Sequence, residues 1–432
     1  MKRKLALFIA LILVIIPLTT SHAENSWIAA KSAVLIDADT GTVLAQKNMD
    51  KQMYPASTTK IMTGILALEN CKLDEVVTVD DKTPYEIEGQ QIYLQAGEII
   101  TMKDLLNAML IQSANDAALL IAKHISGSQE EFAKLMNKKA KEIGAKNTNF
   151  INPNGLHDDN HVTTAYDMAM IARYAMQNET FRNIVSNYTY TIAPTNKQPE
   201  TRYLKSKNKL LYATGSGNKI TIDGNVTNIK YEGATGIKTG YTPEASNCLV
   251  SSASRNGQNL IAVVYYDPGN NLYIDSHNLL DYGFENFTNK KVAFKNEFIE
   301  NIPIEHGSIP FVTAIVGEDI SASIANDKAE KLKRNILLND KITAPITKNQ
   351  ILGKIEYSID NKILTSATII AADSVDQKAI FSVVNTTQSG IVNVFTKWWF
   401  WLIIVFILWR LYIYRRRKKR RRRFKSKYKL KG

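Results

Sequence analysis

The stretch that decides the fold is residues 54–63, which read YPASTTKIMT. From Ser57 onward, apolar residues recur at spacings of three and four, at Ile61, Met62, Ile65, Leu66 and Leu68. This period predicts a helix that begins at Ser57. Ser57 and Lys60 then lie on one face of its first turn, within hydrogen-bonding distance of each other. A serine beside a lysine is the arrangement of a nucleophile next to its base.

The Ser-x-x-Lys spacing is not specific by itself. It recurs at Ser206/Lys209, Ser216/Lys219 and Ser426/Lys429. A second motif, Ser113-Ala114-Asn115, lies between apolar runs at residues 105–110 and 117–121. Two helices flanking so short a segment predict a tight turn, which can face a cleft. Ser-x-Asn is also the pattern of an ordinary helix cap, so this motif too depends on its neighbours.

A third motif, Lys238-Thr239-Gly240, occurs once, just before a predicted strand. Gly240 would let a ligand or another backbone approach that strand closely. A Ser-x-x-Lys at a helix start, a Ser-x-Asn turn and a Lys-Thr-Gly strand, in this order, match the penicillin-recognising serine enzymes.

Longer segments sharpen the resemblance. Residues 54–63, 152–157 (NPNGLH), 161–165 and 236–242 closely resemble the serine D-alanyl-D-alanine carboxypeptidases, which are low-molecular-mass penicillin-binding proteins. The match covers most of residues 33–287. It implies an α/β catalytic domain, in which an antiparallel sheet has helices on both sides, followed by a small C-terminal β domain.

The resemblance also implies a mechanism without a cofactor. Ser57 would attack the penultimate D-alanine carbonyl of a peptidoglycan stem peptide, D-alanine would leave, and water would hydrolyse the acyl-enzyme. Lys60 would be the general base and Ser113 the proton relay to the leaving amine. β-Lactam antibiotics would acylate Ser57 as covalent inhibitors. A lysine at its free pKa of about 10.4 needs a shift of roughly 3 units to act as a base, which burial and Lys238 could supply.

Substrate binding is implied in the same way. Asn115 would hold the substrate amide, and Lys238 and Thr239, with Gly240 beside them, would bind the terminal carboxylate. The backbone N–H groups of Ser57 and Tyr241 would form the oxyanion hole. One departure is that Ser206-Lys207-Asn208 stands where the family usually has Asn-x-Asn. A polar stretch at residues 214–228 also looks longer than is common.

Patterning along the chain predicts its organisation. Residues 33–36 and 42–45 form a hairpin around an Asp/Gly turn, and the runs at 249–250 and 260–266 form adjacent antiparallel strands. Ser128 with Glu131, and Thr164 with Asp167, predict helix N-termini. We expect the catalytic domain at residues 24–288 and the β domain at 289–376, with a turn at residues 360–361. Residues 377–395 are expected to be a linker.

The two ends predict a membrane protein with its catalytic domain outside the cytoplasm. Residues 1–23 read as a cleaved signal peptide, 396–414 as one transmembrane helix, and 415–432 as a basic cytoplasmic tail. From Arg410 onward the chain carries 14 Lys and Arg and no acidic residue, whereas its net charge is +13. The basic character therefore comes from the ends, which argues against a nucleic-acid partner.

Two absences are expected. Cys71 and Cys248 need not pair in a domain with a large core. Neither has a histidine or second cysteine at ligand spacing, and the six histidines form no HExxH-like cluster, so no metal site is expected.

Other functions on the same residues stay open. A class A β-lactamase needs Ser-Asp-Asn, and Ala114 argues against it. A transpeptidase or endopeptidase would share all three motifs, because the difference lies in which acceptor reaches the acyl-enzyme. A non-enzymatic cell-wall-binding module is the remaining alternative. The β domain would act as a stalk above the membrane or as a docking surface.

Overall fold

The computed structural model describes residues 27–378 and 398–427. The expected signal peptide and nearly all of the expected linker lie outside these residues. The described chain divides into two compact units, one of residues up to 290 together with 321–332, the other of 291–320 together with 333 onward. The domain boundary at 288/289 stays a prediction.

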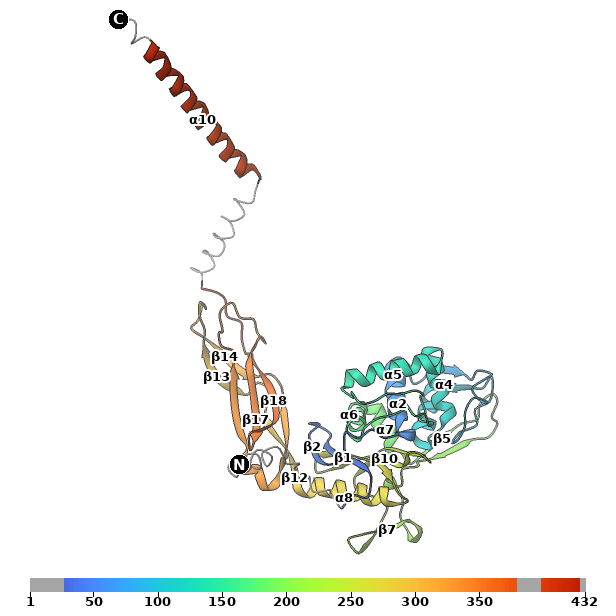
Figure 1. Cartoon of the computed structure of the whole chain (residues 1–432). Coiled ribbons are helices and arrows are strands. Elements are labelled where there is room, and N and C mark those ends of the chain that lie inside the picture. The colour runs from blue at the N-terminus through green and yellow to red at the C-terminus, as the bar shows by residue number, and fades with distance from the viewer. Residues whose placement is uncertain (1–26, 379–397, 428–432) are drawn as a thin grey trace, which may run out of the picture. The chain divides into compact units, whose positions relative to one another are not determined.

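The first unit is built on a five-stranded antiparallel sheet with the order β2-β1-β11-β10-β9 (Figure 1). Its strands are β1 (Ser32–Asp37), β2 (Val43–Lys47), β9 (Ala234–Thr242), β10 (Ser246–Arg255) and β11 (Gln258–Asp267). The two predicted strand pairs are confirmed. Asn256 and Gly257, both with positive φ, make the turn between β10 and β11.

Both faces of this sheet are buried, because side chains alternate along each strand. On β1, Val34 and Ile36 join the core formed with the helices before β9, whereas Ala33 and Leu35 join the core under α8. All four are fully buried. The expected antiparallel sheet with helices on both sides is confirmed.

Six of the α-helices lie in the chain between β2 and β9, and a seventh follows the sheet's last strand. They are α2 (Lys60–Asn70), α3 (Met102–Asn107), α4 (Asn115–Ser126), α5 (Gln129–Ile143), α6 (Ala165–Ala175) and α7 (Glu179–Ser186), and α8 (Asn271–Asn286) follows β11. The predicted caps are present. Ser128 accepts a hydrogen bond from the N–H of Glu131, and Thr164 from that of Asp167.

Short elements complete this unit. The helical turns are η1 (Ala56–Thr59), η2 (Ala108–Gln112, a π-turn), η3 (Lys209–Leu211) and η4 (Ser216–Asn218). Three hairpins pair β3 (Val76–Thr78) with β4 (Ile99–Thr101), β5 (Thr189–Ile192) with β6 (Arg202–Lys205), and β7 (Lys219–Ile222) with β8 (Asn225–Asn228). The polar stretch at 214–228 therefore contains η4 and the whole β7–β8 hairpin.

The C-terminal part of the chain is mostly β, as predicted. A five-stranded sheet has the order β13-β14-β18-β17-β16. Its strands are β13 (Phe298–Pro303), β14 (Phe311–Val316), β16 (Lys333–Leu338), β17 (Ile351–Ile359) and β18 (Lys362–Ala371). β12 (Phe287–Ala293) pairs with β15 (Ile320–Ala325), and η5 (Asn326–Lys331) follows. Asp360 and Asn361 both have positive φ, as a two-residue hairpin of β17 and β18 requires.

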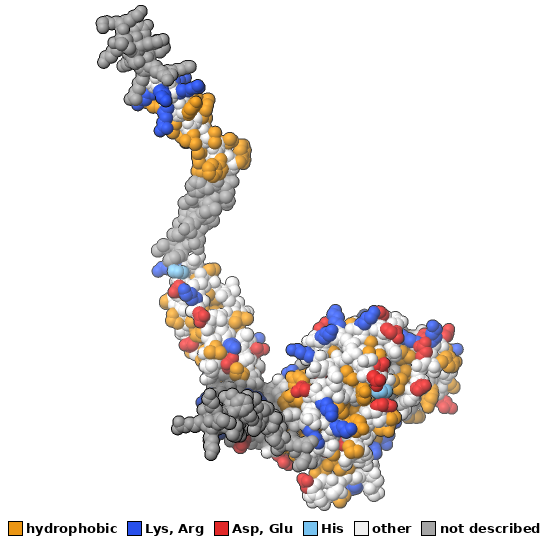
Figure 2. All heavy atoms as spheres, viewed as in Figure 1, with side chains coloured by type: hydrophobic (Ala, Val, Ile, Leu, Met, Phe, Trp, Pro, Cys, Tyr) orange, Lys and Arg blue, Asp and Glu red, His pale blue; other side chains and the backbone are white. Residues whose placement is uncertain are grey.

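The last helix, α10 (Trp398–Lys427), is longer than predicted. Its apolar first part continues without a break into the basic segment, because lysine and arginine are good helix formers. Figure 2 shows hydrophobic side chains over the first part and Lys and Arg side chains beyond them. Within the described residues, one helix, Trp398–Lys419, is long and apolar enough to cross a membrane.

Candidate active site

Ser57 and Lys60 lie where η1 runs directly into α2. The Lys60 Nζ is 2.9 Å from the Ser57 Oγ, so the predicted pair is in hydrogen-bonding contact. The same nitrogen donates to the Asn115 side-chain carbonyl and to the Asn154 backbone carbonyl, each at 2.6 Å. Lys60 is fully buried, so its amine is held by these three partners.

The surroundings of Lys60 disfavour its charged form. Burial lowers the pKa of Lys60 well below its usual value, and the nearby Lys238 lowers it further. The negative charge of Asp116 acts in the opposite direction but does not restore the usual value. Desolvation and a like charge therefore shift the pKa of Lys60 in the direction that a lysine base requires.

Ser113 occupies the tight turn between η2 and α4. Its φ is +67°, a left-handed conformation that a non-glycine residue adopts only where the structure enforces it. The Lys238 Nζ donates to the Ser113 Oγ and to the Thr239 carbonyl, each at 2.9 Å. Residues from the second and third motifs thus meet directly.

Lys238 is also fully buried. Burial lowers its pKa to about 7, and the positive charge of Lys207 adds to the effect. Lys207 belongs to the segment that departs from the family's usual pattern. The sequence did not predict a role for Lys207, because its charge acts on Lys238, a residue far away in the chain.

Strand β9 runs beside the nucleophile. A Cβ added at Gly240 would lie 3.0 Å from the Ser57 backbone nitrogen and 3.1 Å from the Pro55 carbonyl oxygen. Glycine at this position therefore permits β9 to approach η1. Thr239 is half-buried, whereas the Tyr241 side chain is exposed.

The segment at residues 152–157 contributes a residue that sequence reasoning did not assign. The Asn154 carbonyl accepts from Lys60, and the Pro153 carbonyl accepts from the Thr63 hydroxyl at 2.6 Å. A Cβ at Gly155 would overlap the Ala56 carbonyl, at 1.9 Å. The resemblance of this segment to the family was visible in the sequence. The contact made by the Asn154 backbone carbonyl could not be predicted, because every residue type has such a carbonyl.

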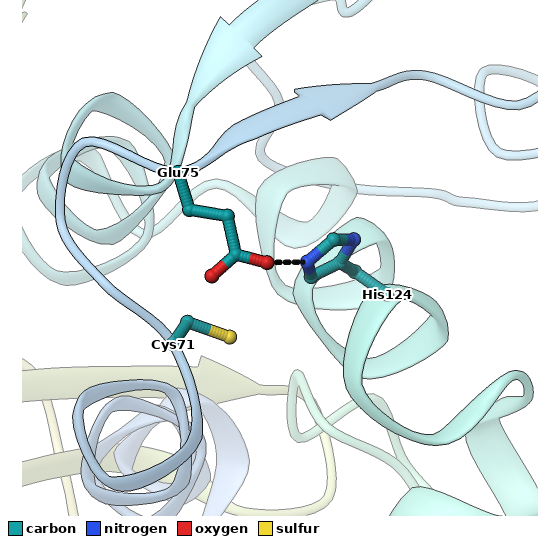
Figure 3. Close-up of side chains that lie close together, drawn as sticks. All are labelled: Cys71, Glu75 and His124. Carbon is teal, nitrogen blue, oxygen red and sulfur yellow. Dashed lines mark hydrogen bonds and ion pairs between the residues drawn. The ribbon is translucent and has the colours of Figure 1, made fainter.

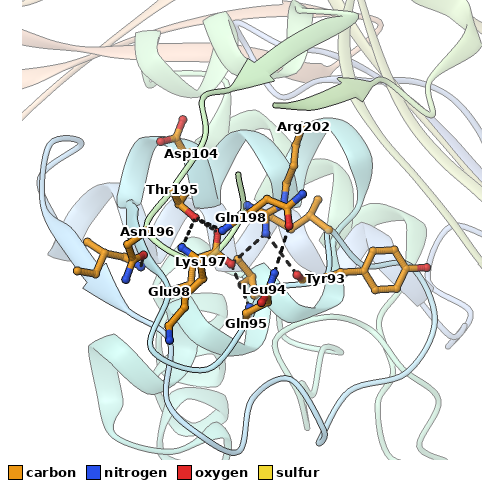
Figure 4. Close-up of polar contacts among 12 residues, drawn as sticks. Tyr93, Leu94, Gln95, Glu98, Asp104, Thr195, Asn196, Lys197, Gln198 and Arg202 are labelled. Atoms are coloured by element: carbon orange, nitrogen blue, oxygen red, sulfur yellow. Dashed lines mark hydrogen bonds and ion pairs between the residues drawn. The ribbon is translucent and has the colours of Figure 1, made fainter. Parts of the chain in front are cut away.

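A network of polar contacts joins the segment before β4 to the β5–β6 hairpin (Figure 4). Glu98, which is fully buried, forms two hydrogen bonds with the Arg202 guanidinium, at 2.6 and 2.9 Å, and a third with the Thr195 hydroxyl. Burial alone would raise the pKa of Glu98, but the bond from Arg202 brings it below its usual range. The network fixes the β5–β6 hairpin, which leads into Lys207, to the segment before β4.

That same segment packs against the start of α4. The Asn115 side chain donates to the Glu88 carbonyl at 2.7 Å, and the Asn115 backbone N–H donates to the Gln90 carbonyl at 2.7 Å. The Asp116 carboxylate accepts from the backbone N–H groups of Ile92 and Leu94. The second motif is therefore held by residues 88–94, through contacts that span 22 to 27 residues of the chain.

An antiparallel sheet between two helical layers, with a half-buried serine and a buried lysine beside its edge strand, is the arrangement of the penicillin-recognising serine enzymes. Comparison with known proteins gives the family. Residues 19–269 match the family described as D-alanyl-D-alanine carboxypeptidase, and residues 287–377 match the C-terminal domain of penicillin-binding protein 5.

Comparisons with individual proteins agree with this family match. The chain is 34% identical to the D-alanyl-D-alanine carboxypeptidase DacF of Bacillus subtilis over 83% of this chain and 89% of that protein. The structure of penicillin-binding protein 5 from Haemophilus influenzae covers 81% of this chain and 98% of its own, at 29% identity and a TM-score of 0.69. A mutant of the Streptomyces K15 DD-transpeptidase covers 60% of this chain and 98% of its own, at 32% identity and a TM-score of 0.53.

The chain belongs to the D-alanyl-D-alanine carboxypeptidase family, peptidase S11, and resembles penicillin-binding protein 5 in having the additional β domain. It is a serine-type D-Ala-D-Ala carboxypeptidase.

Proposed function

We propose that this enzyme removes the terminal D-alanine from peptidoglycan stem pentapeptides through an acyl-enzyme on Ser57. The observation that carries the proposal is the set of partners around the Lys60 amine. A neutral amine has two N–H donors and one lone pair. The carbonyl oxygens of Asn115 and Asn154 can only accept, so they take the two donors. The lone pair is left for the hydroxyl proton of Ser57, 2.9 Å away.

In the acylation step, the Ser57 Oγ attacks the penultimate carbonyl as its proton moves to Lys60. The developing oxyanion would accept from the backbone N–H groups of Ser57 and Tyr241, on η1 and on the adjacent β9. Collapse of this intermediate breaks the amide bond, and the leaving D-alanine nitrogen takes a proton through Ser113. Water then attacks the ester, Ser57 regains its proton, and the shortened peptide leaves.

Substrate orientation would come from the residues around this pair. Protonated Lys238 and the Thr239 hydroxyl would bind the terminal carboxylate of the substrate, and Gly240 would let that strand lie close to Ser57. The Asn115 amide nitrogen has two N–H groups, of which one bonds Glu88. The second is left for the amide carbonyl of the substrate. β-Lactams would enter the same site and acylate Ser57.

The C-terminal helix would anchor the enzyme in the cytoplasmic membrane. Its apolar part is followed by a dense run of Lys and Arg, and such runs remain on the cytoplasmic side. We infer that the active site works outside that membrane, where peptidoglycan lies. In this scheme the β domain, expected at residues 289–376, forms a stalk between the catalytic domain and the membrane.

The likeness to a DD-transpeptidase supports a second candidate activity, transfer of the acyl group to an amine. The two are separated by incubating the full-length protein in detergent with a diacetyl-lysyl-D-alanyl-D-alanine peptide, with and without added glycine. We expect free D-alanine and shortened peptide in both samples. A product extended by glycine would favour the transpeptidase instead. The Ser57→Ala variant should release nothing, whereas Ser216→Ala, in an exposed Ser-x-x-Lys pair, should behave like the wild type.

A further inference from the structure

The structure brings together three possible metal ligands that are scattered in the sequence. Cys71, Glu75 and His124 each offer one ligand atom, and these atoms all lie within 4.8 Å of one another (Figure 3). His124 is 49 residues from Glu75, which is why no ligand spacing was visible in the sequence. The cluster belongs to the first compact unit and shares no residue with the site around Ser57.

We propose that Cys71, Glu75 and His124 form a binding site for Zn²⁺. A thiolate, an imidazole and a carboxylate are the three ligand types that zinc takes in proteins, and this mixture of soft and borderline donors favours zinc over magnesium or calcium. Three protein ligands leave a fourth position for water. The side chains of His124 and Glu75 are partly exposed, at 28% and 38%, so an ion can reach them from solvent.

The observed geometry requires only small adjustments to hold the ion. Ligand bonds of about 2.0–2.3 Å place the donor atoms of a tetrahedral zinc site roughly 3.3–3.7 Å apart. The His124 Nε2 and the Glu75 Oε1 are now 2.7 Å apart, joined by a hydrogen bond. A bound cation would replace the proton between them and push them apart by less than about 1 Å. The other Glu75 oxygen accepts from the Lys72 N–H, which limits the rotation of the carboxylate.

The surrounding charges favour a cation. Cys71 follows the last residue of α2, and His124 lies in the last turn of α4, so both are at the negative ends of helix dipoles. The hollow next to Cys71 is lined by three carboxylates, those of Glu69, Asp74 and Glu75, and by one lysine, Lys72. Of these carboxylates, Glu69 is already paired with Lys139, at 2.8 Å. The neighbouring Lys123 amine turns away to bond Asp80 and Glu86.

A reactive thiol is the competing explanation for a cysteine at this surface. Burial, with a contribution from Glu75, raises the pKa of Cys71, which is the direction that disfavours a reactive thiolate. Coordination of Zn²⁺ by a thiol displaces the thiol proton.

The position of the cluster suggests what the ion would do. α2 begins at the Ser57–Lys60 pair and α4 begins at Asn115, and the cluster joins the opposite ends of these two helices. An ion bound only by the folded chain stabilises it. Zn²⁺ would therefore act as a clamp between the two helices that carry catalytic residues, without touching the substrate.

The test uses full-length, metal-free protein in detergent, titrated with Co²⁺ as a spectroscopic probe and with Zn²⁺ by calorimetry. We expect one equivalent of Co²⁺ to give an intense sulfur-to-cobalt charge-transfer band in the near ultraviolet, which added Zn²⁺ abolishes. Zn²⁺ should also raise the thermal midpoint. In Cys71→Ser the band should disappear. In both Cys71→Ser and His124→Ala, the Zn²⁺ affinity should fall more than about tenfold.

Two controls keep the result interpretable. Asp74→Asn removes the same charge as Glu75→Gln from an adjacent exposed carboxylate, so it should leave the Zn²⁺ affinity within about twofold while Glu75→Gln weakens it by tenfold or more. An unchanged far-ultraviolet circular dichroism spectrum of Cys71→Ser would show that this variant is folded. A wild-type protein without a thiolate–cobalt band, or a band that survives in Cys71→Ser, would overturn the proposal.

Discussion

At the scale of single residues, the proposed mechanism depends on two buried lysines, and the charge of Lys238 lowers the pKa of Lys60. In that mechanism Lys60 must be neutral to accept the Ser57 proton, whereas Lys238 must be protonated to bind a carboxylate. Burial favours the neutral form of both. The enzyme should therefore work in the pH window where Lys60 has lost its proton and Lys238 has kept it.

The pH profile tests this assignment through Lys207. In the proposed mechanism kcat/KM falls as pH rises through the Lys238 pKa of about 7. Lys207→Ala removes a positive charge near Lys238, and its removal favours the protonated form of Lys238. The alkaline limb of the kcat/KM profile should therefore move to higher pH by roughly half a unit to one unit. Lys205→Ala, an exposed lysine nearby, is the matched control. An alkaline limb that stays in place in Lys207→Ala would contradict the role of Lys238.

Gly240 tests the approach of β9 to the nucleophile. In Gly240→Ala the new Cβ would press on the Ser57 backbone nitrogen and on the Pro55 carbonyl, which displaces a proposed oxyanion donor. We expect acylation by benzylpenicillin to slow by about 10²–10³-fold, the usual cost of losing such a donor. Gly217→Ala, at a glycine with no atom within 4 Å of the added Cβ, should acylate normally. Normal acylation in both variants would show that the backbone at Ser57 is not part of the machinery.

The side-chain motifs could be predicted from the sequence, but the groups that contact and position them could not. Ser57 with Lys60 was predictable because the helical period fixes which residues share a face. The Asn154 carbonyl, the charge of Lys207 and the Cys71–Glu75–His124 cluster were not predictable, since each depends on contacts between segments far apart in the chain. The positive φ of Ser113 likewise comes from the packing of two helices and not from its residue type.

At the scale of secondary-structure elements, the hairpins and capped helices were predictable because their signals are local. Asp360-Asn361 determines the β17–β18 turn, and Ser128 and Thr164 mark helix starts. The β5–β6 hairpin carries no comparable local signal. Its position depends on the buried pair of Glu98 and Arg202, which lie more than 100 residues apart.

The Glu98–Arg202 pair should therefore contribute strongly to stability. Arg202→Ala leaves a fully buried carboxylate without its partner, which typically costs about 3–5 kcal/mol of unfolding free energy. Lys134→Ala, which breaks an exposed pair with Glu131, should cost less than about 1 kcal/mol. Denaturation of both variants under identical conditions measures the difference. Equal losses would mean that the buried pair does not anchor this hairpin.

The same pair gives a pH dependence with a definite sign. The pKa of Glu98 is lower in the folded protein than its ordinary value. Glu98 therefore stabilises the fold fully at pH values above its ordinary pKa, and this stabilisation is lost as the pH falls through the folded-state pKa. The stability gap between the wild type and Arg202→Ala should therefore be widest near neutral pH and shrink on acidification. A gap that grows toward low pH would contradict this sign.

At the scale of the whole molecule, the membrane anchor is the part that composition predicts best. An apolar run about 20 residues long followed by basic residues is recognisable without any tertiary contact. A chain that ends after residue 378 should leave the membrane fraction and retain D-alanine release, whereas a chain that ends after residue 427 should stay membrane-bound. Cell fractionation followed by the release assay measures both. Membrane association of the shorter chain would show that another part of the protein provides an anchor.

Whether Ser57 forms the acyl-enzyme is tested by intact-mass measurement after incubation with benzylpenicillin, followed by peptide mapping. We expect one covalent penicilloyl group per chain, located at Ser57 and absent from Ser57→Ala. The Ser216→Ala control should be labelled like the wild type. An adduct on another residue, or an unmodified wild-type protein, would show that Ser57 is not the nucleophile.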